Sequence, residues 1–273
     1  MKIENVIKKF NSNIIYNCPK CYNDMYIENN SLKCSLNHTY DFSKKGYVHL
    51  INNYKSSKYD YKLFEARDFI FYKNFYNHIY LEIVKILSGH NFDILVDVGC
   101  GEGYYIRNLK EYFGYKYFFG IDNSKDAIEF AVKKDKKNPY MLANLSNLPF
   151  ASNSVDVVLN ILTPANYKEF TRIIKKGGLL IKIIPTKNYL REIREKFYEQ
   201  EYSNDDTLIL LEKNCQILSR NTITKTFTIN EEEAKNFLEM TPLTFSKNIK
   251  LEDINSLQKI TVELEIIVAK VMK

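Results

Sequence analysis

Three cysteines and a histidine near the N-terminus are spaced like the ligands of a single metal ion. Cys18 and Cys21 are separated by two residues. Twelve residues then separate Cys21 from Cys34, and three separate Cys34 from His38. Thiolates and an imidazole in this pattern are typical of a tetrahedral zinc site. Because four protein ligands leave no open position for water, we expect a structural Zn2+ that supplies most of the stability of a small module.

This N-terminal pattern has alternative interpretations. A Cys-x2-Cys pair in a cytosolic protein can be a redox motif, although Cys34 and His38 at fitting distances argue against it. A zinc module can also be a simple staple or a dimer contact. Lysines and tyrosines around the site instead indicate RNA recognition, since they could bind phosphates and stack on unpaired bases. These residues are Lys20, Lys33, Lys44, Lys45, Tyr16, Tyr22, Tyr26 and Tyr40.

A glycine-rich turn after a short apolar run is the second chemical signature. Residues 92–96 are typical of a buried strand, and Asp97-Val98-Gly99-Cys100-Gly101-Glu102-Gly103 follows directly. Glycines at alternate positions let the backbone bend sharply and approach a ligand closely. Nineteen residues after Gly103, the strand-like run 117–122 ends in Asp122, at the spacing where an acid meets a ribose hydroxyl pair. The turn is therefore predicted to hold a nucleoside-containing cofactor.

The same pattern favours S-adenosylmethionine over NAD. A dinucleotide fingerprint would have a glycine at position 104, where this chain has Tyr104. The alternative is a tight strand-to-helix turn that binds no ligand. The residues that the pattern makes candidates for cofactor binding are Asp97, Gly99, Gly101, Glu102, Gly103 and Asp122.

The spacing of apolar residues predicts the elements that position these motifs. Over residues 60–88 they recur every three or four positions, which predicts one long helix or a broken pair of helices ended by Gly89. Strand-like and helix-like runs then alternate to about residue 200, which predicts an α/β fold with a doubly wound parallel sheet. The strand-like runs are 92–98, 117–122, 140–144, 155–162 and 179–185. Residues 217–229 and 259–272 should form an antiparallel pair at the edge, with a capping box at Asn230 between them.

Two loops at the carboxyl ends of strands should complete the pocket, because ligands of such sheets bind at that edge. Asn144 and Leu145 follow the third strand, where a polar side chain can meet the adenine edge. Asn160 follows at the end of the fourth. It either faces the substrate or serves as a helix cap or turn residue.

Length and charge limit the function classes. A chain of 273 residues can form one large domain and a small one. The net charge of +6 is concentrated in residues 1–62, which hold ten lysines against five acidic residues. A basic module of this kind is expected to grip a polyanion, although solvated lysines in a lysine-rich proteome are the alternative. Since we find no apolar signal segment and no long uncharged apolar run, we expect a soluble cytoplasmic protein with no membrane partner.

In their order along the chain, these motifs resemble the zinc-containing ribosomal RNA (guanine-N1)-methyltransferase family of the RlmA type. The similarity covers almost the whole length. The segments that carry it are the zinc array, 97–105, Leu148-Pro149-Phe150, 41–50, Ala66-Arg67, 120–125 and Met240-Thr241-Pro242. The resemblance implies a Rossmann-like class I methyltransferase domain behind a zinc ribbon. It also implies methyl transfer from S-adenosylmethionine to N1 of a guanine in a hairpin of large-subunit (23S) ribosomal RNA.

The resemblance further implies roles for individual residues. Gly101, Glu102 and Tyr76 would contact the cofactor. The family has a histidine where this chain has Tyr189, and a tyrosine can replace the ring in the pocket but not its titration. Arg67 is expected to steady a phosphate or guanine O6. Arg67 and Asn160 are the candidates for a catalytic role, and no side chain is identified as the acceptor of the N1 proton.

The predicted domains are a zinc-binding, RNA-recognition module at 1–57, a helical linker at 58–89 and a methyltransferase domain at 90–273. Two other functions remain open: a methyltransferase of small molecules, and a non-catalytic zinc-containing RNA-binding protein. A homodimer is a further expectation. Replacing Cys18 and Cys21 by serine is expected to remove RNA activity with the cofactor still bound, unless the body unfolds as well.

Overall fold

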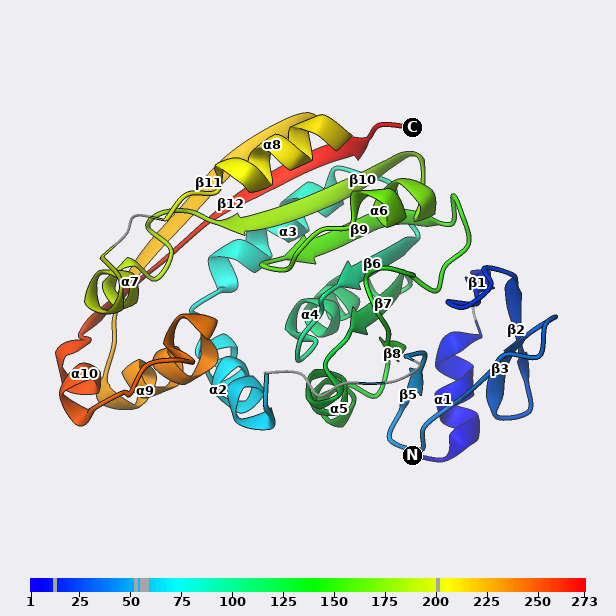
Figure 1. The fold of residues 1–273 in the computed structure, drawn as a ribbon, viewed down its shortest axis with the longest axis horizontal. Helices are drawn as coiled ribbons and strands as arrows, with labels where there is room; N and C mark the ends of the chain where they lie inside the picture. The colour runs from blue at the N-terminus through cyan, green and yellow to red at the C-terminus, as the bar shows by residue number, and fades with distance from the viewer. Residues whose placement is uncertain (12–13, 52–53, 55–58, 200–201) are drawn as a thin grey trace.

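An eight-stranded sheet forms the centre of the molecule (Figure 1). The computed structural model describes all residues except 12–13, 52–53, 55–58 and 200–201. The order of the strands is β11-β12-β10-β9-β6-β7-β8-β5. Their bounds are β5 Tyr47–His49, β6 Ile94–Val98, β7 Tyr117–Asp122, β8 Tyr140–Leu142, β9 Val155–Ile161, β10 Ile174–Pro185, β11 Cys215–Thr228 and β12 Lys259–Val271. Strands β5 to β10 pair in parallel, which confirms the predicted doubly wound fold.

Helices cover both faces of this sheet. On one face lie α2 Tyr61–Tyr72, α3 Asn77–Ser88, α4 Tyr104–Phe113, α5 Lys125–Lys134, α7 Arg191–Phe197 and α9 Glu231–Met240. On the other lie α1 Ile3–Phe10, α6 Tyr167–Ile173 and α8 Asp205–Asn214. Alternate residues of a strand therefore enter different cores: Leu95 belongs to the first and Val96 to the second. Within the described ranges, none of the helices combines the length and apolar character needed to cross a membrane.

The predicted helical segment before the sheet is a broken pair. Asp60 caps α2 by accepting a hydrogen bond from the Leu63 amide at 3.0 Å. The break between α2 and α3 contains Asn74, whose φ is +64°. The left-handed region favours glycine, and asparagine is among the residues that tolerate it best.

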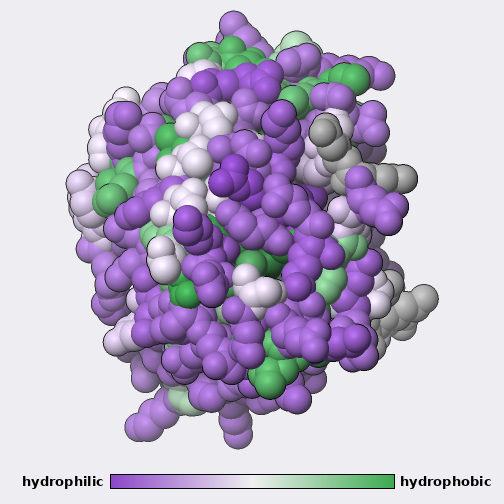
Figure 2. Space-filling model, turned by 90° about the vertical axis from the view of Figure 1, so that its left-hand side faces the viewer, coloured by the Kyte–Doolittle hydropathy of each residue, from purple (hydrophilic) through white to green (hydrophobic). Residues whose placement is uncertain are grey.

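The late antiparallel pair is also confirmed. Strand β11 pairs with β12 along its full length, and β12 pairs with β10 on its other side. Between the two strands, Asn230 and Glu233 form a capping box that begins α9. Helix α9 lies beside α2, and α10 Leu251–Ser256 follows it (Figure 1). The face that carries α7, α9 and α10 is mostly hydrophilic, with hydrophobic side chains only in small separate patches (Figure 2).

The N-terminal module has a small sheet of its own. Its strands are β1 Tyr16–Asn17, β2 Asp24–Glu28, β3 Ser31–Cys34 and β4 Thr39–Asp41. The module shares a hydrophobic core with the large sheet: the Tyr16 ring lies 6.3 Å from those of Phe119 and Phe150. Strand β5, which lies inside the predicted 1–57 range, pairs in parallel with β8. Our expectation that zinc supplies most of the module's stability omitted this shared core.

Candidate active site and metal centre

The four predicted metal ligands converge on one point. The ligand atoms of Cys18, Cys21, Cys34 and His38 all lie within 4.8 Å of one another. His38 Nδ1 is 3.5 Å from the Cys18 sulfur and 3.4 Å from the Cys34 sulfur. The sulfurs of Cys21 and Cys34 are 3.6 Å apart. A tetrahedron with Zn–S of ~2.3 Å and Zn–N of ~2.0 Å has S–N and S–S edges of about 3.6 and 3.8 Å. The residues therefore fit a structural zinc ion.

Only some of the side chains proposed to touch RNA are accessible. Tyr16 and Tyr40 are buried, so they cannot stack on bases. Tyr22 and Tyr26 are about half exposed. Lys20, Lys44 and Lys45 are exposed, and Lys45 pairs with Glu129 at 2.6 Å. Lys33 is half-buried and pairs with Glu28 at 2.8 Å. Fewer side chains are accessible than the sequence suggested, because the residues of a strand point alternately to its two faces and Tyr16 and Tyr40 point inward.

The glycine-rich turn joins β6 to α4 as predicted, and all three of its glycines lie in the left-handed region. The φ angles of Gly99, Gly101 and Gly103 are +87°, +55° and +77°. A Cβ on Gly99 would lie 2.4 Å from the Thr163 side chain, and one on Gly103 would lie 2.5 Å from the Tyr140 hydroxyl oxygen. Both positions therefore require glycine for conformation and for space.

Asp122 holds this turn in place from the end of β7. One carboxylate oxygen accepts a hydrogen bond from the Gly101 amide at 2.9 Å, and the other accepts one from the Ser124 amide at 2.8 Å. Burial raises the pKa of Asp122, while these two amides oppose the rise. The carboxylate and the turn thus form one preorganised edge of a cavity.

The cavity next to this edge has a volume of about 630 Å³, within the range of small-molecule sites. Nine of the twelve residues predicted for cofactor or catalysis line it: Arg67, Tyr76, Asp97, Gly99, Gly101, Glu102, Asp122, Leu145 and Tyr189. They come from α2, the N-cap of α3 and the ends of four strands, β6, β7, β8 and β10. Chain segments far apart in sequence therefore meet at one place, as the doubly wound sheet requires.

The three remaining predicted residues do not line the cavity. Gly103 begins α4 behind the turn, and Asn144 is exposed in the loop after β8. Asn160 is fully buried in β9, where its amide nitrogen donates to the Val98 carbonyl at 2.8 Å and its oxygen accepts from Lys182 at 2.6 Å. Residues 161–164, which follow Asn160, line the cavity instead. The predicted loop is therefore part of the site, but the Asn160 side chain forms hydrogen bonds inside the protein.

Several lining residues were not predicted. They are Tyr59, Phe64, Phe71, Tyr105, Arg194 and the segment 240–243. The hydroxyl of Tyr105 is buried with no hydrogen-bond partner among the described residues. A sequence signal existed for two of them: Tyr105 ends the segment 97–105 of the family resemblance, and Met240-Thr241-Pro242 is another of its segments. Phe64 and Phe71 come from α2, and an apolar helix face has the same pattern whether it lines a core or a pocket. No sequence signal marked Tyr59 or Arg194.

The charges of the cavity suit a cationic ligand. Asp97 is buried, and its Oδ1 has no hydrogen-bond partner among the described residues. Burial, and then the neighbouring Glu102 and Asp122 carboxylates, raise the pKa of Asp97 well above its ordinary value. The Arg67 guanidinium lies 4.0 Å from the Glu102 carboxylate. An unpaired buried carboxylate beside two others is costly unless a cation joins it, and S-adenosylmethionine carries a sulfonium and an ammonium group.

Two tyrosines form the opposite wall. The hydroxyl oxygens of Tyr76 and Tyr189 are 2.7 Å apart, and both side chains are buried. Burial raises the pKa of Tyr76 well above its ordinary value and also raises that of Tyr189. Both hydroxyls therefore stay protonated at neutral pH, and Tyr189 does not titrate there as a histidine would.

Asp97→Asn should stabilise the ligand-free protein and weaken its binding of S-adenosylmethionine. A carboxyl whose pKa is raised in the folded state loses stability as pH rises from its unfolded pKa toward its folded one. Asparagine does not titrate, so the variant should gain stability relative to wild type as pH rises through that window. Urea unfolding at a series of pH values measures this, and calorimetry measures the binding. A stability difference that is constant with pH, or that favours wild type as pH rises, would contradict the assignment.

Comparison with known proteins places this site in a family. Residues 16–58 match the family model for the zinc-ribbon N-terminal domain of RlmA, and residues 96–182 match a methyltransferase domain. The Bacillus subtilis protein YxjB, provisionally named a 23S rRNA (guanine-N1)-methyltransferase, is 32% identical over 249 residues, covering 85% of this chain and 87% of YxjB. The chain belongs to this methyltransferase family.

Two further proteins are less similar to this chain. The 23S rRNA (guanine(748)-N1)-methyltransferase of Streptomyces fradiae is 25% identical over 182 residues, which cover 64% of this chain and 65% of the relative. A solved Bacillus halodurans structure, provisionally titled a methyltransferase, has a TM-score of 0.47 and 16% identity, and the match covers 70% of this chain and 97% of that one. For this RlmA-type methyltransferase, the predicted family, fold class, S-adenosylmethionine cofactor and structural zinc are confirmed.

Proposed function

We propose that this methyltransferase transfers the methyl group of S-adenosylmethionine to N1 of a guanine in a hairpin of 23S ribosomal RNA. One observation carries the proposal: a zinc ribbon of the RlmA type and a cofactor-type cavity occur in one chain, and a relative named for this reaction matches across both. The basic charge of residues 1–62 supports a polyanionic substrate. With this substrate, we expect the protein to work in the cytoplasm.

The residues of the cavity account for how the cofactor would be held. When bound, S-adenosylmethionine supplies an activated methyl group on a positively charged sulfur. Asp122 presents a carboxylate at the strand end where a ribose is bound in such folds. Asp97 offers an unpaired carboxyl oxygen for the cationic part. Gly99 and Gly101 allow the backbone to approach closely because they have no side chain.

The substrate side of the cavity is lined by residues that could receive an extruded base. Arg67 lies there with a partly exposed side chain, close to Glu102 and 3.4 Å from the Met240 carbonyl oxygen. Its guanidinium can donate to guanine O6, as arginine commonly does. Turning a loop base out of its stack costs a few kcal/mol. The protein's contribution is then mainly to align the base in a site shielded from water.

The zinc ribbon would grip the hairpin through its accessible cations and rings. Lys20, Lys44 and Lys45 can contact phosphates, and the half-exposed ring of Tyr26 can stack on an unpaired base.

The proposal also includes a homodimer. Light scattering of the purified protein tests this oligomeric state.

Purified protein should transfer labelled methyl groups to unmodified 23S ribosomal RNA, and the label should be on guanine N1. A small-molecule methyltransferase would leave the RNA unlabelled, since the same sheet supports many substrates. A non-catalytic RNA-binding protein would bind the RNA without labelling it. Label on any other atom, or on no RNA, would contradict the proposal.

A further inference from the structure

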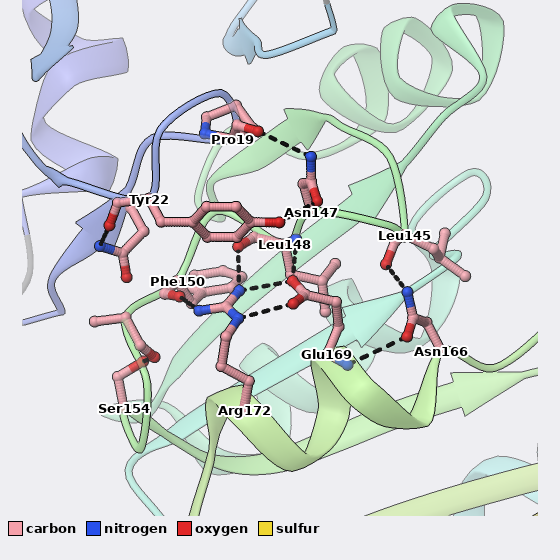
Figure 3. A network of polar contacts seen from close by, with 12 residues as sticks. Pro19, Tyr22, Leu145, Asn147, Leu148, Phe150, Ser154, Asn166, Glu169 and Arg172 are labelled. Carbon is pink, nitrogen blue, oxygen red and sulfur yellow. Dashed lines mark hydrogen bonds and ion pairs between the residues drawn. The ribbon is translucent and has the colours of Figure 1, made fainter. Parts of the chain in front are cut away.

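The loop between β8 and β9 connects the two sites of this protein. Leu145, near its start, lines the cofactor cavity. Residues 145–150 belong to no strand. The Asn17 amide of β1 donates to the Pro149 carbonyl at 3.3 Å, and side chains from elsewhere hold the rest of the segment. Figure 3 shows that they do so from two sides, one belonging to the zinc ribbon and the other to α6. We call residues 144–150 the cofactor loop.

On the zinc-ribbon side, the contact is made by the turn of residues 18–22, which carries Cys18 and Cys21 and which we call the zinc knuckle. Asn147 of the cofactor loop donates from its side-chain nitrogen to the Pro19 carbonyl at 2.9 Å. The Tyr22 hydroxyl donates to the side-chain oxygen of Asn147. Pro19 lies between Cys18 and Cys21, and Tyr22 follows Cys21 directly. Both partners of Asn147 therefore belong to the turn that the zinc ion folds.

The α6 side of the contact is a buried ion pair. Glu169 is only 3% exposed, and it accepts from the Leu148 amide at 2.6 Å and from Arg172 at 2.7 Å. Arg172 donates to the carbonyl oxygens of Leu148 and Phe150 at 2.7 and 2.6 Å. Its guanidinium also lies over the Tyr22 ring, 5.7 Å from the centroid. Glu169 and Arg172 thus form three hydrogen bonds with the cofactor loop, and Arg172 also contacts the Tyr22 ring (Figure 3).

We propose that Asn147, Glu169 and Arg172 are positioning residues that couple the zinc knuckle to the cofactor cavity. The folded knuckle fixes Asn147 and the ring beneath Arg172, and these hold the loop that carries Leu145. Cofactor affinity then depends on the knuckle even when no RNA is present. This inference rests on the proposed role of the cavity, and it replaces the sequence-based expectation that a protein without zinc would keep its cofactor.

The size of the effect follows from the population of the correct loop position. If a variant holds the loop correctly in about one molecule in ten, the apparent Kd for the cofactor rises about tenfold. We expect a rise of this size for Arg172→Ala, which also leaves Glu169 as an unpaired buried charge. Asn147→Ala cuts only the link to the knuckle, so we expect a rise of about threefold to fivefold on the same basis.

Calorimetric titration of the full zinc-loaded chain with S-adenosylmethionine, without RNA, tests the inference. Arg220→Ala is the matched control, because Arg220 pairs with Glu265 at 2.7 Å on the outer strand β11, away from both sites. It should leave the Kd unchanged. Removing zinc from wild type with a chelator should raise the Kd by at least as much as Asn147→Ala does. Because both changes act on the same connection, their combined effect on the Kd should be smaller than the product of the two separate effects.

Hydrogen exchange separates positioning from general destabilisation. The Leu148 amide is bonded to Glu169 and the Ala151 amide to the Ile15 carbonyl at 2.9 Å, so both should exchange faster after chelation while β6 and β7 stay protected. If the Arg172→Ala protein fails to fold, the Kd of the Asn147→Ala protein still tests the inference. A folded Asn147→Ala protein with a Kd within about twofold of wild type, or effects of chelation and mutation that multiply, would overturn the inference alone. Wild-type protein that binds no S-adenosylmethionine would overturn the proposed function with it.

Discussion

Replacing Cys18 and Cys21 with serine should abolish methylation of ribosomal RNA. Serine hydroxyls do not bind zinc at neutral pH as thiolates do, and two of the four ligands would be lost. Structural zinc contributes about 10 kcal/mol or more to the folding of small modules. We expect activity to fall by more than the roughly 100-fold that loss of an outer-shell partner of a metal ligand can cost. Transfer of labelled methyl groups to unmodified 23S ribosomal RNA measures it.

Cys215→Ser is the matched control for this double variant. Cys215 is buried at the start of β11 and lies outside both the metal cluster and the cavity. It should retain zinc and most of its activity. A double variant that methylates the RNA at the wild-type rate, with no bound zinc by metal analysis, would show that the ribbon is dispensable for the reaction.

Gly99→Ala should have an equally large effect, through the cofactor. The new Cβ would lie 2.4 Å from Thr163, whose loop lines the cavity, and alanine at a φ of +87° is strained as well. Left-handed strain costs about 1–2 kcal/mol by itself, and the collision must displace either the turn or the Thr163 loop. We therefore expect the Kd for S-adenosylmethionine to rise at least about tenfold, since each factor of ten needs only about 1.4 kcal/mol.

Gly114→Ala separates the strain from the collision. Gly114 has a φ of +56° at the end of α4, and a Cβ there would meet no atom within 4 Å. This control should lose about 1 kcal/mol of stability and bind the cofactor normally. Equal affinities for the Gly99→Ala protein and wild type would mean that the turn does not contact the cofactor.

The sequence predicted best those features that depend on neighbouring residues. The glycine turn after β6, the capping box at Asn230 and the metal ligands are all defined within short segments. The β11–β12 pair followed from alternation in two runs. In each case, the residues that form the feature are the same residues whose types and spacing predicted it.

Features that depend on distant partners were not predictable in this way. Nothing in residues 47–49 indicates that they extend the large sheet beside β8. The burial of Tyr16 and Tyr40 follows from packing between the ribbon and the sheet. Asn160 looked like a loop residue because its partner, Lys182, lies on the next strand. Burial lowers the pKa of Lys182 to about 8, and such an amine needs acceptors like the Asn160 oxygen.

The packing also changes the picture of the zinc ribbon. If the zinc ribbon were a separate basic module, its only role would be to bring the RNA to the methyltransferase domain. The structure shows it inserted into one of the two cores of the body, with Asn147 and Arg172 linking its knuckle to the cofactor loop. A single metal site can thus serve the stability of the fold, the grip on the substrate and the geometry of the cavity.

Mass spectrometry of 23S ribosomal RNA from cells with and without this gene tests the central claim most directly. Our account predicts one guanine in a hairpin that carries an N1-methyl group in the first sample and none in the second. It also predicts that the gene with Gly99→Ala fails to restore the methyl group. Identical modification of 23S ribosomal RNA in the two samples, or the loss of a methyl group from any other position, would contradict it.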